Sequence, residues 1–223
     1  MSGTLSIVAT PIGNLADITY RAVEILRMSD VIVCEDTRVT GKLCAHYDID
    51  VQRTALHHHS PQGKIDKIVE RLQGGENIAY VSDAGTPGVS DPGNQLVAAA
   101  TAAGVCVTPI PGASALSAVI SVAGIDMQRF TFLAYPPHKK GRHTFFDVVA
   151  ASDIPVVYYD SVHRIVKNLT LLQEKKTDAQ VVVGRELTKM FEEVRYGNVS
   201  EVLTYFIDHG EKVKGEFVVI VYT

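Results

Sequence analysis

The sequence predicts an α/β fold made of two subdomains, and three observations point to it. Short runs rich in valine and isoleucine alternate with longer stretches whose apolar residues recur at helical spacing. The runs are apolar at nearly every position, which is typical of parallel strands covered on both faces. The alternation begins again after Pro111–Ala113, near the middle of the 223 residues. We therefore expect α/β subdomains at residues 1–112 and 113–223, mainly parallel sheets, and a ligand cleft between the two halves.

The first half supplies strand-like runs separated by helical stretches. The expected strands are Leu5–Thr10, Val31–Glu35, Asn77–Asp83 and Val105–Gly112. The expected helices are Ile18–Ser29, Lys64–Gly75 and Asn94–Gly104. Ala22, Ile25 and Leu26 share one face of the first helix, and Gly74 and Gly75 end the second.

The second half repeats the pattern. The expected strands are Phe130–Pro137, Ile154–Ser161, Ala179–Leu187 and Glu216–Thr223. A helix is expected over Val162–Gln173, directly after the second of these strands. Another is expected over Ala113–Gly124, and because it is apolar on most faces we expect it to suit an interface.

The composition is that of an ordinary globular protein, with 46% hydrophobic and 21% charged residues. Its 21 basic and 25 acidic residues leave a net charge of −4, which argues against binding nucleic acid by bulk charge. Residues 1–115 hold 8 basic and 12 acidic residues, and residues 116–223 hold 13 of each, so the second half is less acidic. The three cysteines lack CxxC spacing, which argues against a zinc site or a disulfide framework. Neither a signal peptide nor an apolar run near the roughly 20 residues of a membrane span is visible, so we expect a cytoplasmic protein.

Four strand ends are rich in glycine, proline and small polar residues. They are Thr10–Asn14, Cys34–Arg38, Ser82–Gly93 and Pro109–Ala115. Ligands of open parallel sheets bind at the carboxyl ends of strands, where glycine lets the backbone approach and proline stiffens the loop. One such loop is often only a turn, but four together suggest a site for a small polar molecule with an aromatic part. Neither a P-loop nor a GxGxxG motif is present, which argues against ATP hydrolysis and dinucleotide redox chemistry.

Other polar segments allow two readings each. The HHHS segment His57–Ser60 cannot direct three adjacent histidines at one tetrahedral metal, so we expect a loop contact and no metal site. The basic segment His138–His143 is either a solvated face or a phosphate contact. Tyr158–Arg164 and Gly184–Lys189 place charges directly after apolar strands, so they are expected to pair with each other, to line the cleft, or both.

Six motifs together resemble the rRNA small subunit methyltransferase I family, whose members are 16S rRNA cytidine 2′-O-methyltransferases. The motifs are TPIGNLADIT, EDTRVTGKL, VSDAGTPGVSDPG, PIPGASAL, YYDSVHR and GRELTK, in this order between Leu5 and Val221. The resemblance implies a tetrapyrrole methylase-like, class III methyltransferase with S-adenosylmethionine in the cleft between two α/β subdomains, usually in a homodimer. It also implies a cytidine ribose in 16S rRNA of the small ribosomal subunit as methyl acceptor.

The resemblance further implies which residues form the site. The expected cofactor-binding residues are Thr10, Pro11, Ile12, Asp83, Gly85, Thr86, Ser114, Ala115, Tyr159 and Asp160. In this reading Ser114 and Ala115 contact the adenosine portion, and Tyr159 and Asp160 close the far wall. Lys139, Lys140 and Arg142 are the expected RNA contacts.

Methyl transfer from a sulfonium is an in-line displacement, so alignment of the reacting groups accounts for most of the acceleration. A ribose hydroxyl is a poor nucleophile at neutral pH, and a general base or a polarising cation helps it to react. Asp36, Arg38, Asp160, Glu186 and Lys189 follow strands and are the candidates. We expect Asp36 and Arg38 to contact the substrate and Glu186 or Lys189 to handle the proton. No metal is required.

Two departures from the family pattern leave other functions open. The family's YES triplet is YDS at Tyr159–Ser161, which shortens the carboxylate side chain by one methylene. The small helical C-terminal module of many members is not expected, because the sequence ends at Thr223. The alternatives are a methyltransferase for a tetrapyrrole-like small molecule, a ribosome factor that binds the cofactor without catalysis, and a sugar or nucleotide binder with two lobes. They differ in acceptor, in turnover and in preference for S-adenosylmethionine over adenosine.

Overall fold

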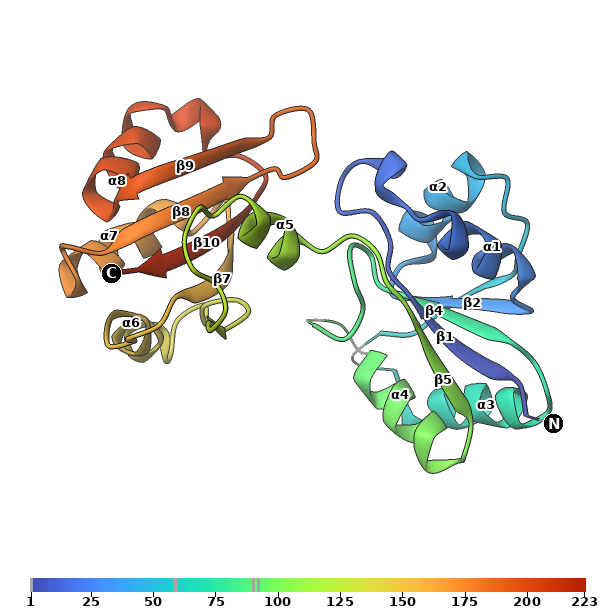
Figure 1. Ribbon diagram of the computed structural model, residues 1–223. Coiled ribbons are helices and arrows are strands. Elements are labelled where there is room, and N and C mark those ends of the chain that lie inside the picture. The colour runs from blue at the N-terminus through green and yellow to red at the C-terminus, as the bar shows by residue number, and fades with distance from the viewer. Residues whose placement is uncertain (1, 58–59, 90, 92) are drawn as a thin grey trace. The chain divides into compact units, whose positions relative to one another are not determined.

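The computed structural model describes residues 2–57, 60–89, 91 and 93–223. It divides into two compact units, Met1–Ser114 and Ala115–Thr223, called here the N-terminal and C-terminal units (Figure 1). Each unit contains one five-stranded sheet with helices packed against it. Among the described residues, none of the helices combines the length and apolarity required for a membrane span.

The N-terminal unit is built on a parallel sheet with the strand order β3-β2-β4-β1-β5. Its strands are β1 (Thr4–Val8), β2 (Val31–Cys34), β3 (Arg53–Ala55), β4 (Ile78–Val81) and β5 (Cys106–Ile110). Its helices are η1 (Leu15–Asp17), α1 (Tyr20–Met28), α2 (Thr37–His46), α3 (Gln62–Gln73) and α4 (Gly93–Ala102).

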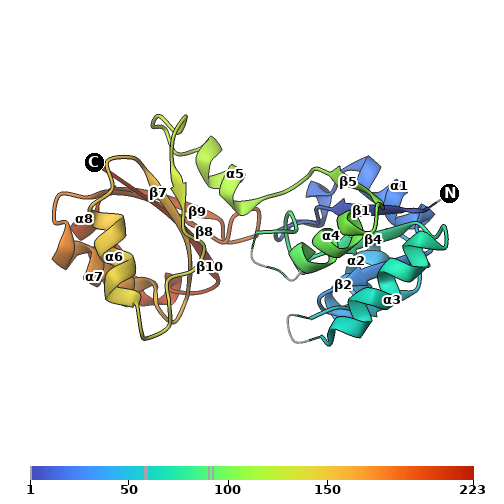
Figure 2. The same ribbon diagram turned by 90° about the horizontal axis from the view of Figure 1, so that it is seen from below.

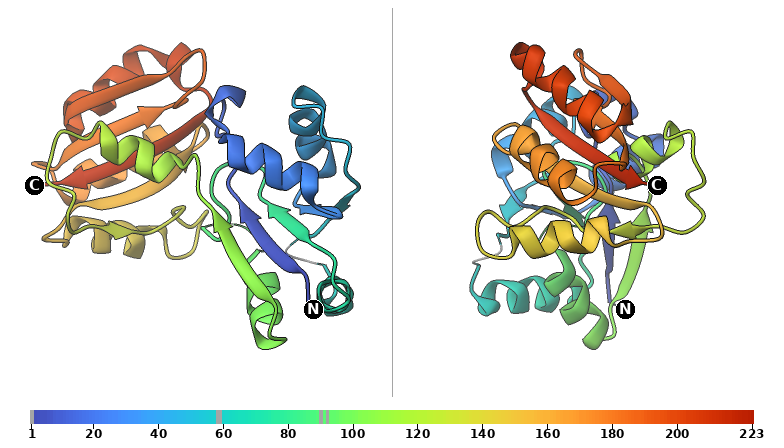
Figure 3. Two further views of the ribbon diagram at one scale, coloured as in Figure 1. Left: turned by 45° about the vertical axis from the view of Figure 1, so that its right-hand side comes forward. Right: turned by 90° about the vertical axis from the view of Figure 1, so that its left-hand side faces the viewer.

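Helices cover both faces of this sheet (Figures 1 and 3). Leu26 of α1 and Cys44 of α2 pack in one apolar cluster with Ile32 of β2. Leu72 of α3 and Leu96 of α4 pack in a second cluster on the other face. Every residue of β2 and β4 is therefore buried, which explains their uninterrupted apolar sequences. The helices that follow β1 and β4 pack on opposite faces of the sheet, an arrangement that is typical of the ligand sites of open α/β sheets.

The C-terminal unit has a mixed sheet with the strand order β6-β7-β10-β8-β9. Its strands are β6 (Thr131–Phe132), β7 (Val156–Ser161), β8 (Gln180–Arg185), β9 (Glu193–Asn198) and β10 (Glu216–Tyr222). Its helices are α5 (Ala115–Ser121), α6 (Arg142–Ala150), α7 (Ile165–Lys175), α8 (Val199–Asp208) and η2 (Gly210–Lys212). Helices α6, α7 and α8 lie on one side of the sheet and α5 lies on the other (Figure 2).

The expectation of mainly parallel strands is wrong for the C-terminal unit. Strand β10 runs between β7 and β8 and is antiparallel to both, and β9 is antiparallel to β8. Only β6 and β7 pair in parallel. The residues Phe217–Val221 are buried on both faces, because α6–α8 cover one side and α5 the other. Burial on both faces makes a strand apolar at every position whichever way it runs, so its pattern does not reveal its direction.

Several elements were missed or misjudged in length. Helix α2 begins in a segment expected to be a loop, and α6, β9 and α8 were not expected at all. Strand β9 is half-exposed and lacks an apolar run, because it is the edge strand of its sheet. Helix α8 begins with a capping box formed by Asn198 and Glu201, a signal that the sequence does contain. The expected strand Phe130–Pro137 is only the two-residue β6, and the expected helix Ala113–Gly124 is the seven-residue α5.

Candidate functional site

Three of the predicted cofactor loops meet in the N-terminal unit. The amide of Thr10, after β1, donates to the carbonyl of Gly85 at 3.0 Å, and the amide of Gly85 donates back to Thr10 at 3.0 Å. The hydroxyl of Thr86 donates to the carbonyl of Ala113, after β5, at 3.0 Å. The loops that follow β1, β4 and β5 are therefore joined at one edge of the sheet.

Glycine is required where these loops approach one another. Gly85 has φ +76°, and a Cβ atom there would lie 3.2 Å from Cγ2 of Ile12. At Gly112 a Cβ atom would lie 3.0 Å from Cβ of Ala9. Side chains at either position would force the loops apart. Because the glycines leave backbone in place of side chains, these loops form a cradle that a ligand can approach closely.

The loop after β2 joins the loop after β4 through carboxylates. The amide of Asp36 donates to Oδ1 of Asp83 at 3.0 Å. The amide of Asp83 donates in turn to Oε1 of Glu35 at 3.2 Å. The EDTR segment therefore lies beside the Asp83 end of the predicted cofactor loop.

Asp36 is the N-cap of α2 and also binds Arg38. Its Oδ1 atom accepts from the Arg38 amide at 2.8 Å, and its Oδ2 atom accepts from Nη2 of Arg38 at 2.7 Å. Hydrogen bonds from the Arg38 side chain and amide lower the pKa of Asp36 to about 2, so the carboxylate is ionised near neutral pH. The Arg38 side chain is 87% exposed, which leaves it available to a substrate.

Asp91 holds the predicted cofactor loop through three hydrogen bonds, and it is not among the residues predicted from the sequence. Its buried carboxylate accepts from the hydroxyl of Tyr80 at 3.2 Å, from the amide of Gly93 at 2.9 Å and from the amide of Gly88. Burial, and then the carboxylates of Asp91 and Glu35, raise the pKa of Tyr80 well above its ordinary value, so the phenol stays protonated and donates. The available signal was an aspartate before the start of a helix, the usual residue for bonding free amides there.

In the C-terminal unit, the predicted residues Tyr159 and Asp160 point to opposite faces of the sheet. The Tyr159 ring is half-buried and packs against Phe132 at 5.0 Å between ring centroids. The Asp160 side chain is 1% exposed and accepts from Nδ2 of Asn168 at 2.8 Å and from the Ser161 amide at 2.8 Å. Burial raises its pKa against these two hydrogen bonds. The Asp160 carboxylate therefore lies in the helix-covered core near the β7–α7 turn. That Asp160 and Tyr159 both contact the cofactor stays a prediction.

Glu186 and Lys189 form a charged cluster with Glu216 of β10. Nζ of Lys189 donates to Oε1 of Glu186 at 2.7 Å and to Oε2 of Glu216 at 2.8 Å. Partial burial disfavours the charged forms, but the ion pairs outweigh it, so the pKa of Glu186 is lowered and that of Lys189 is raised. Glu186 has φ +49°, and the amide of Glu216 donates to its Oε1 at 3.0 Å. The Glu186 carboxylate and the Lys189 ammonium are thus held together, both charged.

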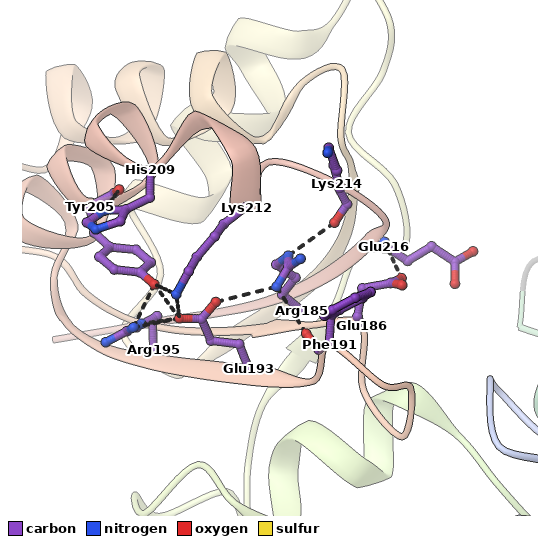
Figure 4. A network of polar contacts seen from close by, with 10 residues as sticks. All are labelled: Arg185, Glu186, Phe191, Glu193, Arg195, Tyr205, His209, Lys212, Lys214 and Glu216. Carbon is purple, nitrogen blue, oxygen red and sulfur yellow. Dashed lines mark hydrogen bonds and ion pairs between the residues drawn. The ribbon is translucent and has the colours of Figure 1, made fainter.

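A neighbouring network holds the two turns around this cluster (Figure 4). Arg185 is buried and donates to the carbonyls of Phe191 at 3.0 Å and Lys214 at 3.2 Å. It also pairs with Glu193 at 3.4 Å. Further bonds to Glu193 come from Arg195, Tyr205 and Lys212. Arg185 thereby anchors both the turn that carries Lys189 and the turn that precedes Glu216.

The predicted RNA contacts lie at the start of α6. Lys139 and Lys140 are exposed, and Arg142 is the first residue of the helix. His57 is exposed, whereas His58 and His59 of the HHHS segment lie outside the described residues. Among the residues that the structure describes, no group of three or more histidine, cysteine, aspartate or glutamate side chains is arranged to hold a metal ion.

Similarity to a known protein family and to known proteins extends along nearly the whole chain. The family model described as Tetrapyrrole (Corrin/Porphyrin) Methylases matches residues 4–203. A ribosomal RNA small subunit methyltransferase I from Xylella fastidiosa is 46% identical over 221 residues, which are 98% of this chain and 81% of that protein. A protein of the same name from Borrelia garinii is 42% identical over 219 residues, 97% of each chain.

Solved structures of the same fold are more distant in sequence. A cobalt precorrin-4 methyltransferase of cobalamin biosynthesis has a TM-score of 0.71 at 15% identity, with 97% of this chain and 94% of that chain covered. A uroporphyrin-III-C-methyltransferase from Thermus thermophilus has a TM-score of 0.67 at 16% identity, with 99% and 94% covered. At these identities the likeness concerns the fold alone.

Proposed function

The chain belongs to the tetrapyrrole methylase family and, within it, to the ribosomal RNA small subunit methyltransferase I family, and on that premise we propose that it methylates the 2′-hydroxyl of a cytidine ribose in 16S rRNA. It is a methyltransferase that uses S-adenosylmethionine. We choose ribosomal RNA as the acceptor because the chain is 46% identical, over 98% of its length, to a ribosomal RNA small subunit methyltransferase I. We extend the proposal to a cytoplasmic homodimer that acts on the small ribosomal subunit.

The linked loops of the N-terminal unit fit the cofactor. When bound, S-adenosylmethionine supplies a methyl group activated by a positively charged sulfur. The cradle offers backbone at Gly85 and Gly112 and a carboxylate at Asp83, which suits a ligand with hydroxyl and amino groups. We assign the cofactor to Thr10, Pro11, Ile12, Asp83, Gly85, Thr86, Ser114 and Ala115, with Tyr159 added from the C-terminal unit. The Asp160 carboxylate is left out of this set, because its side chain is engaged in the core.

The charged state of the Glu186–Lys189 pair separates their roles. Lys189 keeps its proton because its pKa is raised, so it acts as a cation that stabilises negative charge developing on the ribose oxygen. The bound cofactor would supply the methyl group, and the ribose oxygen that accepts it would lose its proton. Ionised Glu186 orients Lys189 and is the candidate to receive that proton.

The substrate contacts come from both units. Asp36, ionised and bound to Arg38, presents the exposed guanidinium to the acceptor. Lys139, Lys140 and Arg142 contact RNA phosphates. These local basic segments of the protein can bind a folded ribosomal particle without a positive net charge, since RNA is recognised largely through shape and local contacts.

The test is transfer of label from S-adenosylmethionine. Small ribosomal subunits that lack ribose methylation, naked rRNA and a tetrapyrrole-like small molecule are offered in parallel, with the Lys189→Met variant as control. We expect label on a cytidine ribose in assembled subunits, lost in the variant. Label on the small molecule alone would overturn the RNA assignment. Calorimetric binding of the cofactor without label on any acceptor would instead favour a ribosome factor that has lost catalysis.

A further inference from the structure

An exposed aromatic ring lies in the C-terminal unit, which also carries two charged segments assigned to the substrate. Tyr135 follows β6 in the C-terminal unit, and the residue is 45% exposed. One side of its ring packs on Tyr159, with the ring centroids 5.4 Å apart and the planes inclined by 57°. The residue is therefore more exposed than a tyrosine with an available core position, which is normally buried more completely.

The fold imposes this exposure through the backbone on both sides of Tyr135. Ala134 has φ +52°, an uncommon conformation for alanine, and its carbonyl accepts from the Tyr159 amide at 2.8 Å. After the ring, Pro136 is buried and its carbonyl accepts from Nη1 of Arg164 at 2.6 Å. Tyr135 is therefore presented by a segment tied to β7 and to the start of α7.

Charged groups assigned to the acceptor lie close to Tyr135 in the sequence or act on its hydroxyl. In the sequence, Lys139 and Lys140 follow within five residues, and both are exposed. In the fold, partial burial raises the pKa of the Tyr135 hydroxyl, and the charges of Glu216, Arg164, Asp160 and Lys189 also act on it. The ring thus belongs to the same segment as Lys139 and Lys140, and the charge of Lys189 acts on its hydroxyl.

We propose that Tyr135 is a stacking platform for an unpaired nucleobase of the RNA acceptor. The proposal rests on the proposed function, because it assumes an RNA substrate. Proteins hold single-stranded or splayed-out bases by stacking them on exposed aromatic rings next to basic side chains that contact phosphate. Tyr135 provides the ring, and the segment after it provides the cations.

The first test separates stacking from charge. Tyr135→Leu keeps an apolar side chain and removes the ring, so RNA affinity should fall about tenfold, within the range measured for loss of one stacked base. The slope of affinity against salt concentration should stay unchanged, since no phosphate contact is lost. Tyr135→Phe keeps the ring and should bind as the wild type does. The melting temperature should be unchanged in both variants.

The second test exploits the absence of tryptophan from the chain. Tyr135→Trp introduces a single fluorescent reporter that also stacks well. Acceptor RNA should quench its fluorescence, and S-adenosylmethionine alone should not. Tyr20→Trp is the matched control, because Tyr20 is 93% exposed at the start of α1 in the other unit, and RNA should leave its fluorescence unchanged.

The outcomes distinguish this inference from the proposed function. If wild-type protein neither binds nor methylates small-subunit RNA, the proposed function fails and the stacking role fails with it. If the wild type methylates RNA but Tyr135→Leu binds that RNA equally well, only the stacking role is overturned. Quenching of Tyr135→Trp by the cofactor alone would mean that the ring contacts S-adenosylmethionine and would also overturn it. If Tyr135→Leu has a lowered melting temperature, its RNA affinity is set aside, and quenching of the folded Tyr135→Trp protein by RNA decides whether the ring stacks on a base.

Discussion

Replacing Asp91 with alanine should loosen the predicted cofactor loop and destabilise the N-terminal unit. The Asp91 carboxylate is the shared acceptor for the hydroxyl of Tyr80 and the amides of Gly88 and Gly93. Tyr80 is fully buried and Gly93 is buried, whereas Gly88 is exposed. Only the exposed Gly88 amide can turn to water when the carboxylate is removed.

The magnitude follows from the two donors that stay buried. An unsatisfied buried donor costs about 1–3 kcal/mol, so the free energy of unfolding should fall by about 3 kcal/mol in Asp91→Ala. That is a large part of the roughly 5–15 kcal/mol by which a typical domain is stable. Asp91→Asn keeps an acceptor oxygen of the same shape and should lose about 1 kcal/mol. The cofactor affinity should fall about tenfold in Asp91→Ala, because positioning loop backbone is worth roughly the 1.4 kcal/mol of a tenfold change.

The assay is urea denaturation followed by far-UV circular dichroism, with cofactor affinity measured by calorimetry. Tyr80→Phe removes one of the buried donors. The free energy of unfolding of Tyr80→Phe/Asp91→Ala should therefore exceed, by about 1 kcal/mol or more, the value expected from adding the losses of the two single variants. A loss below about 0.5 kcal/mol in Asp91→Ala, the range of ordinary surface changes, would refute the reasoning. Strict additivity of the two changes would refute it as well.

Three other substitutions test the charged groups. Lys189→Met should lower the methyl transfer rate about a hundredfold. In the wild type the Glu186–Lys189 ion pair adds stability that is fully present above pH 4.5 and is lost as the pH falls through the lowered pKa of Glu186. This contribution should be missing when Lys189→Met is unfolded by acid. Gly215→Ala should reduce the rate but leave cofactor affinity intact, because its Cβ atom would lie 2.2 Å from Cδ of Glu186 at φ +83°. Lys139→Ala/Lys140→Ala should lower the salt slope of RNA binding by about 1.4, and an unchanged slope would contradict phosphate contact.

Local chemistry made much of the N-terminal unit predictable. Its strands are short apolar runs that end in glycine and proline, and the right-handed parallel connections leave few arrangements for them. Gly85 could be singled out because glycine lets loop backbone approach closely, and the structure joins its loop to those after β1 and β5. Helix α2 was still missed, although Asp36 before Thr37 is a recognisable N-cap.

The sequence by itself determined the α/β composition of both units, the polar loops at the strand ends and the resemblance that leads to a methyltransferase. Only the tertiary structure decided that β10 runs antiparallel between β7 and β8, which brings Glu216 to Lys189 across 27 positions of the chain. It alone showed that Asp91 bonds Tyr80 under the predicted cofactor loop and that the Asp160 side chain lies in the core. The physical reason is that strand direction, ion pairing and hydrogen-bond satisfaction depend on partners distant in sequence, whereas turns, caps and apolar periodicity are written within a few residues.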